Sequence, residues 1–199
     1  MVEFCNSETK KNLMRAFAGE SQARNRYTFA ASQAKKQGME AIEQVFIFTA
    51  GQEKEHAEIF YNHLSAFSGE NIHVDGGYPV DISQSVSQLL RYAERNEYEE
   101  YNDVYKAFGD KAKEEGFIAI ANSFYLISEI EKTHGDRFAQ LADMLENNSL
   151  YVSSVECKWM CLNCGHIYSG TTVPEQCPVC HHSKGYFIHL TLAPYTQSN

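Results

Sequence analysis

The sequence predicts a mainly α-helical protein: a four-helix bundle with one long crossover connection, joined to a small C-terminal module of β and turn structure. Three observations support this prediction. Apolar residues recur in steps of three and four over four long segments, the pattern of helices with one buried face. Residues 68–82 break this periodicity with glycines and a proline. Two C-x-x-C pairs follow near the C-terminus.

Length and composition limit the kind of protein. The chain has 199 residues, enough for one large and one small domain, and its net charge of −9 argues against a basic nucleic-acid-binding surface. No apolar run is long enough to span a membrane, and the N-terminus shows no export signal. We therefore expect a cytoplasmic protein with no nucleic-acid or membrane partner. In that compartment paired cysteines usually bind a metal rather than form a disulfide.

The first helix is expected to start near Ser7 or Thr9, either of which could cap it, and to end at Gly38. Its inward stripe includes Glu20 and, two turns further on, Tyr27. A single glutamate at such a place is usually a solvated residue at the edge of the stripe, but the other helices carry acids at corresponding depths. Tyr27 is either a core aromatic residue or a hydrogen-bond donor to a carboxylate ligand.

The second and fourth helices, expected at about residues 39–67 and 116–146, carry the same Glu-x-x-His motif on an apolar stripe. The motif residues are Glu53 and His56 in the second helix and Glu131 and His134 in the fourth. Residues three apart lie on one face of a helix, so each pair offers a carboxylate and an imidazole to one point. Burying such groups without compensation is costly. Two Glu-x-x-His helices, with a Glu from each of two others, form the ligand set of ferritin-like di-iron bundles.

The third helix is expected to begin near Ser83 and contains a cluster of acids. At about 100° per residue, Glu97 lies at the centre of the apolar stripe and Glu100 near one edge. Glu94 falls somewhat further off the other edge, and Glu99 points away. We take Glu97 and Glu100 as inward, with Glu94 as the alternative. A solvated acidic face would explain Glu94 and Glu99 but not Glu97.

Together the predicted helices bring five carboxylates and two imidazoles to one buried site. These residues are Glu20, Glu53, Glu97, Glu100, Glu131, His56 and His134. Five acids packed together cannot all stay ionised without compensating charge. Two metal ions would supply that charge, and carboxylates with imidazoles suit iron or manganese. A pair of ions bridged by carboxylates can share electrons and clamp a small oxygen species.

The C-terminal segment predicts a second metal site of a different kind. The expected parts of the chain are a bundle at residues 1–147, a linker at 148–157, a metal module at 158–190 and a tail at 191–199. The four thiolates of the two C-x-x-C pairs favour a tetrahedral site: Cys161, Cys164, Cys177 and Cys180. Iron there would move single electrons, whereas zinc would be a structural staple, and the spacing is compatible with both. Cys5 and Cys157 have no matching partners and are expected to be plain thiols.

The sequence also resembles one family over nearly its full length. The first helix carries the run Asn12-Leu-Met-Arg-Ala-Phe-Ala-Gly-Glu20-Ser-Gln-Ala-Arg-Asn-Arg-Tyr27, and the second carries Gln52-Glu53-Lys-Glu-His56. The third shows Glu97-x-x-Glu100 followed by Tyr105, and the fourth shows Glu131-x-x-His134 followed by Arg137-Phe138. The segment from Lys158 to Cys180 is similar to a rubredoxin module. These motifs are long and specific, and the chain therefore resembles rubrerythrin.

The resemblance implies a non-haem di-iron peroxidase that reduces hydrogen peroxide to water in oxidative-stress defence. It implies that electrons pass from NAD(P)H, through a reductase and often a small rubredoxin, to iron held by the four cysteines and then to the di-iron pair. The two irons would share Glu53 and Glu131 as bridges. Glu20 would bind one iron, with Glu97 and His134 on the other. The resemblance further implies a homodimer, in which the four-cysteine iron of one chain serves the other chain's di-iron site.

Three features concern the details of this resemblance. In the family one iron exchanges a glutamate for the second-helix histidine with redox state, and alignment makes these Glu100 and His56 rather than Glu94 and His56. Tyr27 and Tyr105 match positions that hydrogen-bond the cluster. His181 stands where rubredoxins usually have Gly after the second knuckle, the turn formed by the second C-x-x-C pair, and this puts the conformation of that turn in question.

The tail after Leu190 has no family role and is expected to be a loose end.

Two other functions remain as alternatives. One is a ferroxidase, an iron-handling ferritin-like protein that oxidises ferrous iron. Such a protein has no need of an electron-input module, so the rubredoxin-like segment argues against it. The other is a regulatory bundle with a zinc ribbon for partner binding.

Overall fold

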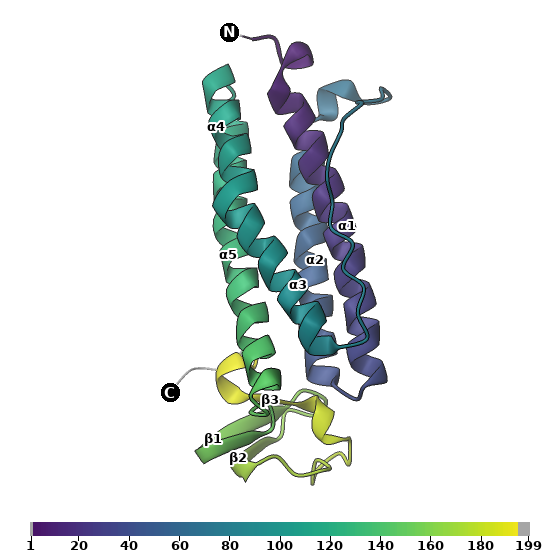
Figure 1. Cartoon of the computed structure of the whole chain (residues 1–199), viewed down its shortest axis with the longest axis vertical. Helices are drawn as coiled ribbons and strands as arrows, with labels where there is room; N and C mark the ends of the chain where they lie inside the picture. The colour runs from purple at the N-terminus through teal and green to yellow at the C-terminus, as the bar shows by residue number, and fades with distance from the viewer. Residues whose placement is uncertain (1, 195–199) are drawn as a thin grey trace.

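The computed structural model describes residues 2–194, in which four long helical rods stand side by side above a small sheet (Figure 1). The first two rods are α1 (Glu8–Lys36) and α2 (Glu40–Asn62). The third rod runs from α3 (Val86–Glu99) through a π-helical turn (Glu100–Val104) into α4 (Tyr105–Glu115), and α5 (Ile118–Glu146) is the fourth. The predicted bundle with one long crossover is confirmed. No helix of the described residues is long and apolar enough to cross a membrane.

The helix boundaries follow local capping chemistry. Ser7 caps α1, because its side chain accepts a hydrogen bond from the backbone N–H of Lys10, as the sequence predicted. Ser85 caps α3 in the same way, two residues after the expected start. Gly116 ends α4 with a left-handed φ of 94°. The second helix ends at Asn62, not at Phe67, because the chain there tightens into a short 3₁₀ turn at residues 65–67.

The uniform helical spacing that we assumed for the third rod was wrong, because the π-helical turn inserts an extra residue per turn between Glu97 and Tyr105. This turn frees the backbone carbonyl of Tyr101, which accepts a 3.0 Å hydrogen bond from the buried hydroxyl of Ser128 on α5. The turn therefore has a partner on the adjacent helix and is part of the packed structure.

Two apolar clusters fill the bundle and leave a polar layer between them. One cluster, which includes Tyr27, Phe46 and Phe138, occupies the half near the sheet. The other, which includes Phe60 and Phe124, occupies the far half. On α1, α2 and α5 the residues between the two clusters are the predicted metal ligands. The apolar packing thus fixes the depth at which the acids are buried.

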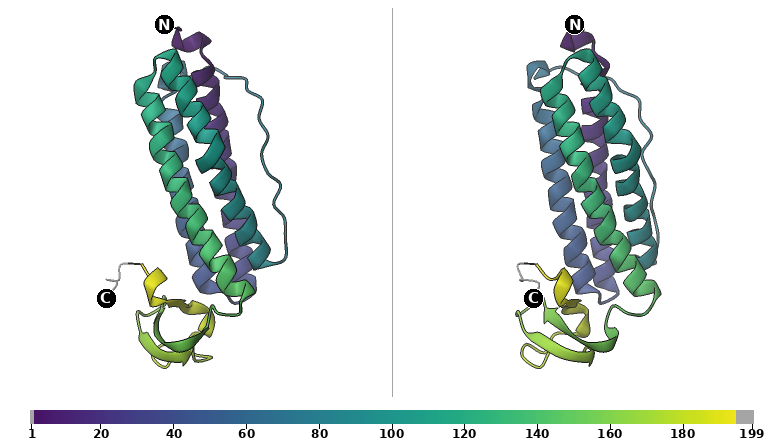
Figure 2. Two further views of the ribbon diagram at one scale, coloured as in Figure 1. Left: turned by 60° about the vertical axis from the view of Figure 1, so that its left-hand side comes forward. Right: turned by 90° about the vertical axis from the view of Figure 1, so that its left-hand side faces the viewer.

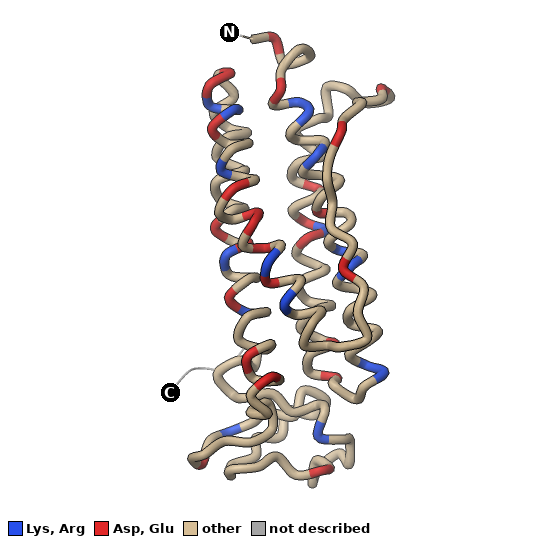
Figure 3. The backbone as a smooth tube through the Cα atoms, in the orientation of Figure 1, with Lys and Arg blue, Asp and Glu red and all other residues tan. Residues whose placement is uncertain are grey.

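The crossover strap, residues 68–85, runs the length of the bundle without helix or strand (Figure 2). It lies beside α1 in Figure 1 and along the third rod in the right-hand view of Figure 2. Ion pairs hold it to the helices: Arg15 binds Asp75 at 2.7 Å, and Arg26 binds Asp81 at 2.9 Å. Along the rods, Lys and Arg are interspersed with Asp and Glu (Figure 3).

The C-terminal module is an antiparallel sheet in the order β2-β1-β3, built from β1 (Val152–Cys161), β2 (Ile167–Thr172) and β3 (Phe187–His189). Because β1 starts at Val152, regular structure begins inside the segment that we expected to be a linker. The expected loose tail is also corrected in part: Leu190–Leu192 form a 3₁₀ turn, and Leu192 packs against the bundle core. Residues 195–199 of that tail lie outside the described part of the chain.

Candidate metal centres

The structure brings the acids and histidines of the bundle into two groups that share two members. The first group is Glu20, Glu53, His56 and Glu131, and the second is Glu53, Glu97, Glu131 and His134. Within each group one ligand atom per residue lies within 4.8 Å of the others, and every member is buried. Glu53 and Glu131 belong to both groups and offer one oxygen to each side. This is the arrangement of two adjacent cation sites bridged by two carboxylates.

Both imidazoles point the same ring nitrogen at the acids. The Nδ1 atom of His56 lies 3.1 Å from Glu53 Oε2 and 3.0 Å from Glu131 Oε1. The Nδ1 atom of His134 lies 3.0 Å from Glu53 Oε1 and 2.9 Å from Glu131 Oε2. The two rings are nearly parallel, with an interplanar angle of 16°. Each histidine therefore stands beside both shared carboxylates, one on either side of the pair.

Several of these buried atoms have no hydrogen-bond partner among the described residues. They are Glu20 Oε2, Glu53 Oε1, Glu97 Oε2, both carboxylate oxygens of Glu131, and His134 Nδ1. The ion-pair distances above are short, but the lone pairs do not meet a donor in hydrogen-bond geometry. Buried polar atoms left in this way are costly. Lone pairs that converge on common points are satisfied by cations, so the residues fit a pair of metal ions.

The shifted pKa values of the buried acids and histidines also indicate that this site is stabilised by added positive charge. Burial raises the pKa values of Glu20 and Glu97 well above the usual range, and neighbouring carboxylates add to the effect. Burial would lower the pKa of His134, but Glu131 and Glu53 outweigh it and raise that pKa to about 12. Burial would likewise raise the pKa of Glu131, yet the adjacent imidazoles of His134 and His56 lower it to about 2. Protons on the imidazoles thus balance the acids, and metal ions compete for the same place.

A second layer of side chains orients the ligand residues. The hydroxyl of Tyr27 donates to Glu97 Oε1, and that of Tyr105 donates to Glu20 Oε1 at 2.6 Å. Burial raises the pKa of both tyrosines well above the usual range, so both remain hydrogen-bond donors. The contacts that the resemblance implied for Tyr27 and Tyr105 are therefore present. Each tyrosine holds one terminal carboxylate in place.

Sequence reasoning did not identify Gln52 and Arg137 as parts of this layer. His134 Nε2 lies 3.1 Å from Gln52 Oε1, so His134 donates from Nε2, and its Nδ1 faces the acids, where it can hold a proton or bind a metal ion. The guanidinium of Arg137 donates to Gln52 Oε1 at 3.4 Å and to Thr49 Oγ1 at 2.9 Å. Both residues lie next to ligand motifs and within the runs that carry the family resemblance, and these two signals could have pointed to them.

Glu100 and Glu94 have different surroundings. Glu94 is tied to Arg91 at 2.8 Å on the outer side of α3. Glu100 opens the π-helical turn, belongs to neither ligand group, and is partly exposed in a cavity beside the site. Burial raises its pKa well above the usual range, with Glu97 and Glu131 as further causes. Of these two acids, Glu100 is therefore the one that interacts electrostatically with the buried cluster.

The four cysteines of the C-terminal module form a compact sulfur cluster. Cys161 Sγ lies 3.8 Å from Cys180 Sγ, and Cys164 Sγ lies 3.7 Å from Cys177 Sγ. A tetrahedral ion with metal–sulfur bonds of about 2.3 Å requires sulfur–sulfur distances of about 3.8 Å, whereas a disulfide requires about 2.05 Å. The cluster therefore fits a tetrahedral ion, and the disulfide alternative is excluded. Cys5 and Cys157 are free and lie outside this cluster.

The two knuckles around the sulfurs have the same backbone design. Gly165 follows the first knuckle with a φ of 77°, and His181 follows the second with a φ of 61°. Their N–H groups donate to the carbonyls of Cys161 and Cys177 at 2.8 and 2.9 Å. His181 thus adopts the left-handed conformation that glycine prefers, which answers the question raised by the sequence.

Comparison with known proteins agrees with this geometry. The family profile described as Rubrerythrin matches residues 11–142, and the one described as Rubrerythrin, rubredoxin-like domain matches residues 159–188. Rubrerythrin of Porphyromonas gingivalis is 44% identical over 91% of this chain and 89% of its own length. Rubrerythrin-1 of Clostridium acetobutylicum is 40% identical over 96% of this chain and 98% of its own length.

Solved structures give the same result for the fold. A mixed-valence state of nigerythrin matches with a TM-score of 0.61 and 28% identity, over 95% of this chain and 91% of that one. The bacterioferritin of Desulfovibrio desulfuricans matches with a TM-score of 0.64 over 71% of this chain and 82% of that one, and at 22% identity it shows the ferritin-like fold alone. With its bundle, its two bridged ligand groups and its four-cysteine module, the chain belongs to the rubrerythrin family, a family of iron-binding oxidoreductases with a di-iron site and a rubredoxin-like four-cysteine site.

Proposed function

We propose that this protein is a non-haem di-iron peroxidase that reduces hydrogen peroxide to water in defence against oxidative stress. One observation carries the proposal: two buried ligand groups share Glu53 and Glu131 in a chain that also contains a four-cysteine cluster of the electron-transfer type. The family membership supports a di-iron protein of oxidative stress, and the peroxidase activity is our inference from the site. Reduction of one hydrogen peroxide molecule consumes two electrons and two protons and yields two molecules of water.

The proposed roles follow from the geometry. Glu53 and Glu131 would serve both irons, because each carboxylate faces both ligand groups. Glu20 and His56 would complete one iron site, and Glu97 and His134 the other. Glu100 would be the alternative to His56 as a ligand in one redox state. Iron bound by these residues would supply the electrons for reduction of the O–O bond.

The protein residues set the conditions for this reaction. Tyr27 and Tyr105 hold Glu97 and Glu20 through hydrogen bonds, so the terminal carboxylates keep their positions while charge on the site changes. Gln52 fixes the tautomer of His134. The apolar clusters lie on either side of the polar layer and keep it away from bulk water, which strengthens the electrostatic interactions inside.

The four-cysteine cluster is proposed as the point where electrons enter. A tetrahedral site with four thiolates has no open position for a substrate, so iron there would transfer single electrons. Backbone N–H groups of residues 163 and 164 bond Cys161, and that of His182 bonds Cys180, contacts that tune the potential of such a centre. The proposed donors are rubredoxin and an NAD(P)H-dependent reductase. We also propose a cytoplasmic homodimer or higher homo-oligomer, in which the four-cysteine iron of one chain serves the other chain's di-iron site.

Metal analysis and rapid kinetics test the proposal. Protein from iron-replete cells is expected to contain about three irons per chain, two in the bundle and one at the cysteines. After chemical reduction, the di-iron site is expected to be oxidised faster by hydrogen peroxide than by dioxygen in a stopped-flow experiment. A clear preference for dioxygen would favour the ferroxidase alternative. Zinc at the cysteines with no metal in the bundle would favour the regulatory one.

A further inference from the structure

We infer that the crossover strap covers the opening through which peroxide reaches the di-iron site, and that Tyr78 on the strap limits the size of the peroxide admitted. This inference rests on the proposed peroxide reduction and adds a selectivity residue outside the ligand set. Tyr78 comes from a segment that contributes no ligand to either metal group. Its contacts, the cavity beneath it and the glycine that accommodates its ring carry the inference.

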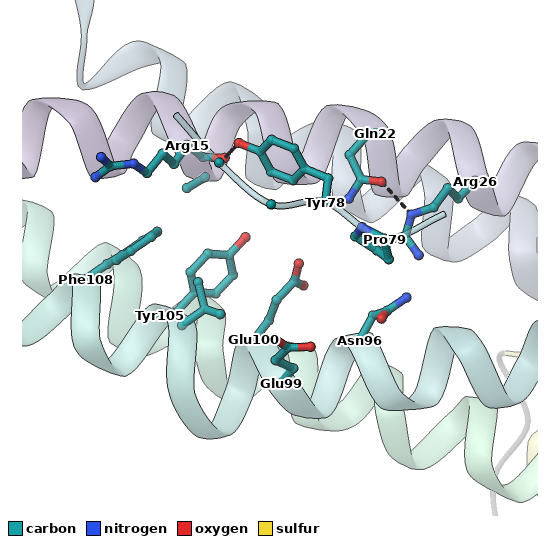
Figure 4. Close-up of a pocket in the computed structure, with 14 residues that line it drawn as sticks. Arg15, Gln22, Arg26, Tyr78, Pro79, Asn96, Glu99, Glu100, Tyr105 and Phe108 are labelled. Atoms are coloured by element: carbon teal, nitrogen blue, oxygen red, sulfur yellow. Dashed lines mark hydrogen bonds between the residues drawn. The ribbon is translucent and has the colours of Figure 1, made fainter. Parts of the chain in front are cut away.

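A cavity of about 280 Å³ separates the strap from the site (Figure 4). Tyr78 and Pro79 of the strap lie on one side of it, and Glu100 and Tyr105 lie across from them. The hydroxyl of Tyr105 is bonded to Glu20 at 2.6 Å, so the inner wall of the cavity is one hydrogen bond away from a ligand group. The cavity therefore lies directly outside the side chains that contact the iron-binding acids.

The walls of this cavity are mixed: apolar side chains, among them Ala16, Val104 and Phe108, alternate with polar ones. They include the polar side chains of Gln22, Asn96, Glu99 and Glu100. Hydrogen peroxide can donate and accept hydrogen bonds along such walls. An alkyl group would cover these polar groups without satisfying them, which is unfavourable. The polar groups thus add a cost for an alkyl group that covers them, and the selection that we infer rests mainly on size.

Tyr78 lies at the outer edge of the cavity and is held against α1. Its hydroxyl donates to the backbone carbonyl of Arg15 at 2.9 Å. A Cβ added to Gly19, the residue before Glu20, would lie 3.7 Å from the Tyr78 ring, which places the ring over that turn of the helix. The side chain is 40% exposed, so one face of the ring meets solvent while the other covers the cavity.

Two ion-pair clamps hold the strap on either side of Tyr78. Before it, Asp75 binds Arg15 through its carboxylate at 2.7 Å and through its backbone carbonyl at 3.0 Å. After it, the buried carboxylate of Asp81 receives hydrogen bonds from Arg26, Arg95 and Asn96 at 2.9, 3.0 and 2.6 Å. The two clamps hold the ends of the short segment that carries Tyr78, the buried Asp81 more firmly than the exposed Asp75. The position of its ring is therefore defined by the fold.

Because residue 76 is a glycine, there is room for the Tyr78 ring in its position over the cavity. A Cβ there would lie 2.9 Å from the Tyr78 hydroxyl and 3.0 Å from two ring carbons, closer than such contacts allow. A Cβ on the neighbouring Gly77 would meet no described atom within 4 Å. Gly76→Ala is thus expected to push the ring outward without changing Tyr78 itself, and Gly77→Ala is a matched control for the flexibility of the segment.

The test compares Tyr78→Ala, Gly76→Ala and Gly77→Ala in the iron-loaded, full-length protein. Stopped-flow spectroscopy measures how fast the chemically reduced di-iron site is oxidised by hydrogen peroxide and by tert-butyl hydroperoxide. A site that is too small for one or more methyl groups of a substrate prefers the smaller substrate by roughly 10-fold or more, and this preference is lost when the steric contact is removed. We therefore expect the preference for hydrogen peroxide to fall about tenfold in Tyr78→Ala and in the same direction in Gly76→Ala, while Gly77→Ala keeps the preference of the unaltered protein.

A second measurement does not depend on peroxide reduction. Azide binding to the oxidised di-iron site, followed by its absorption change, is expected to be faster in Tyr78→Ala and Gly76→Ala than in Gly77→Ala. Unchanged selectivity and unchanged azide rates in correctly folded Tyr78→Ala and Gly76→Ala would overturn the inference. If no variant and no unaltered protein consumes peroxide, the proposed function fails, and the azide rates still decide whether Tyr78 covers the route.

Discussion

The two metal centres of this protein are built in opposite ways. The four-cysteine cluster takes all its ligands from two short knuckles, and its sulfur–sulfur distances of 3.7 and 3.8 Å already match a tetrahedral ion. The bundle site takes its ligands from four rods, including Glu20 and Glu131, which are far apart in the sequence. Its acids are buried at a depth set by the apolar clusters. The first site is therefore a local device, and the second is a property of the whole bundle.

This difference has an energetic consequence. The four-cysteine module lacks a core large enough for independent stability and depends on its metal as a staple. The bundle has its own apolar core, and burying its acids opposes folding unless protons or cations compensate. Loss of metal should therefore unfold the module but leave the bundle folded and sensitive to pH. The four predictions below test this comparison.

The largest expected effect comes from a bridging carboxylate. Glu131→Gln keeps the side-chain volume but replaces an anionic oxygen with an amide nitrogen, so it cannot bridge two cations. We expect bundle iron to fall from about two to fewer than one per chain, with the four-cysteine iron retained. Metal analysis together with visible absorption measures both. Glu94→Gln is the matched control, because Arg91 holds Glu94 away from the site; full iron content in Glu131→Gln would contradict the assigned bridge.

Cys161→Ser tests the other half of the comparison. Cys161 is fully buried in the core of the module, so the variant is expected to lose the metal of the four-cysteine cluster and the order of the sheet. Turnover driven by NAD(P)H and a reductase should then be abolished. The chemically reduced di-iron site should still consume peroxide, because the bundle folds around its own core. Loss of iron from the bundle in this variant would show that the two centres depend on each other.

The third prediction concerns pH and the metal-free bundle. The folded pKa of His56 is about 9, above its ordinary value of 6.5; burial would lower it, but Glu131 and Glu53 raise it. The stability that its proton contributes is therefore fully present below pH 6.5 and is lost as the pH rises through 9. One pKa unit corresponds to about 1.4 kcal/mol, or a Tm change of about 2–4 °C in a chain of this size.

Chelator-treated protein is thus expected to melt at a lower temperature at pH 9 than at pH 6.5 in a calorimetric scan. Metal ions displace the imidazole proton, so the iron-loaded protein should not show this loss. Glu131→Gln removes one of the two carboxylates beside each histidine and should reduce the pH dependence of the metal-free form. A metal-free bundle whose stability rises over this interval would refute the interpretation.

The smallest expected effect lies in the second knuckle. His181 has a φ of 61°, a conformation that costs a residue with a Cβ about 1–2 kcal/mol, part of which glycine loses again through its greater freedom when unfolded. His181→Gly is expected to stabilise the module by up to about 1 kcal/mol. Gly165→Ala, at the equivalent position of the first knuckle, should destabilise it by a similar amount. Denaturant unfolding followed through the absorption of the four-cysteine iron measures both, and equal stability of the two variants would contradict the symmetry of the knuckles.

Local patterns in the sequence were enough to predict most of the architecture. The Glu-x-x-His motifs predicted which faces of two helices meet, because residues three apart share a face of any helix. The aperiodic residues 68–82 predicted the crossover, and the C-x-x-C pairs predicted a tetrahedral cluster from spacing alone. The capping role of Ser7 was also predictable, since it depends only on the next few residues.

Other features depended on contacts between segments that are distant in the sequence. The π-helical turn after Glu99 depends on Ser128 of another helix, so uniform periodicity could not locate it. Whether Glu94 or Glu100 faces the site was decided by that turn and by Arg91. The strap brought Tyr78 over Gly19 through ion pairs that span 55 to 60 residues of sequence. The sequence by itself determined which residues have the chemistry to bind iron, and tertiary packing decided which of them meet and what covers them, because burial and contact are properties of the assembled helices.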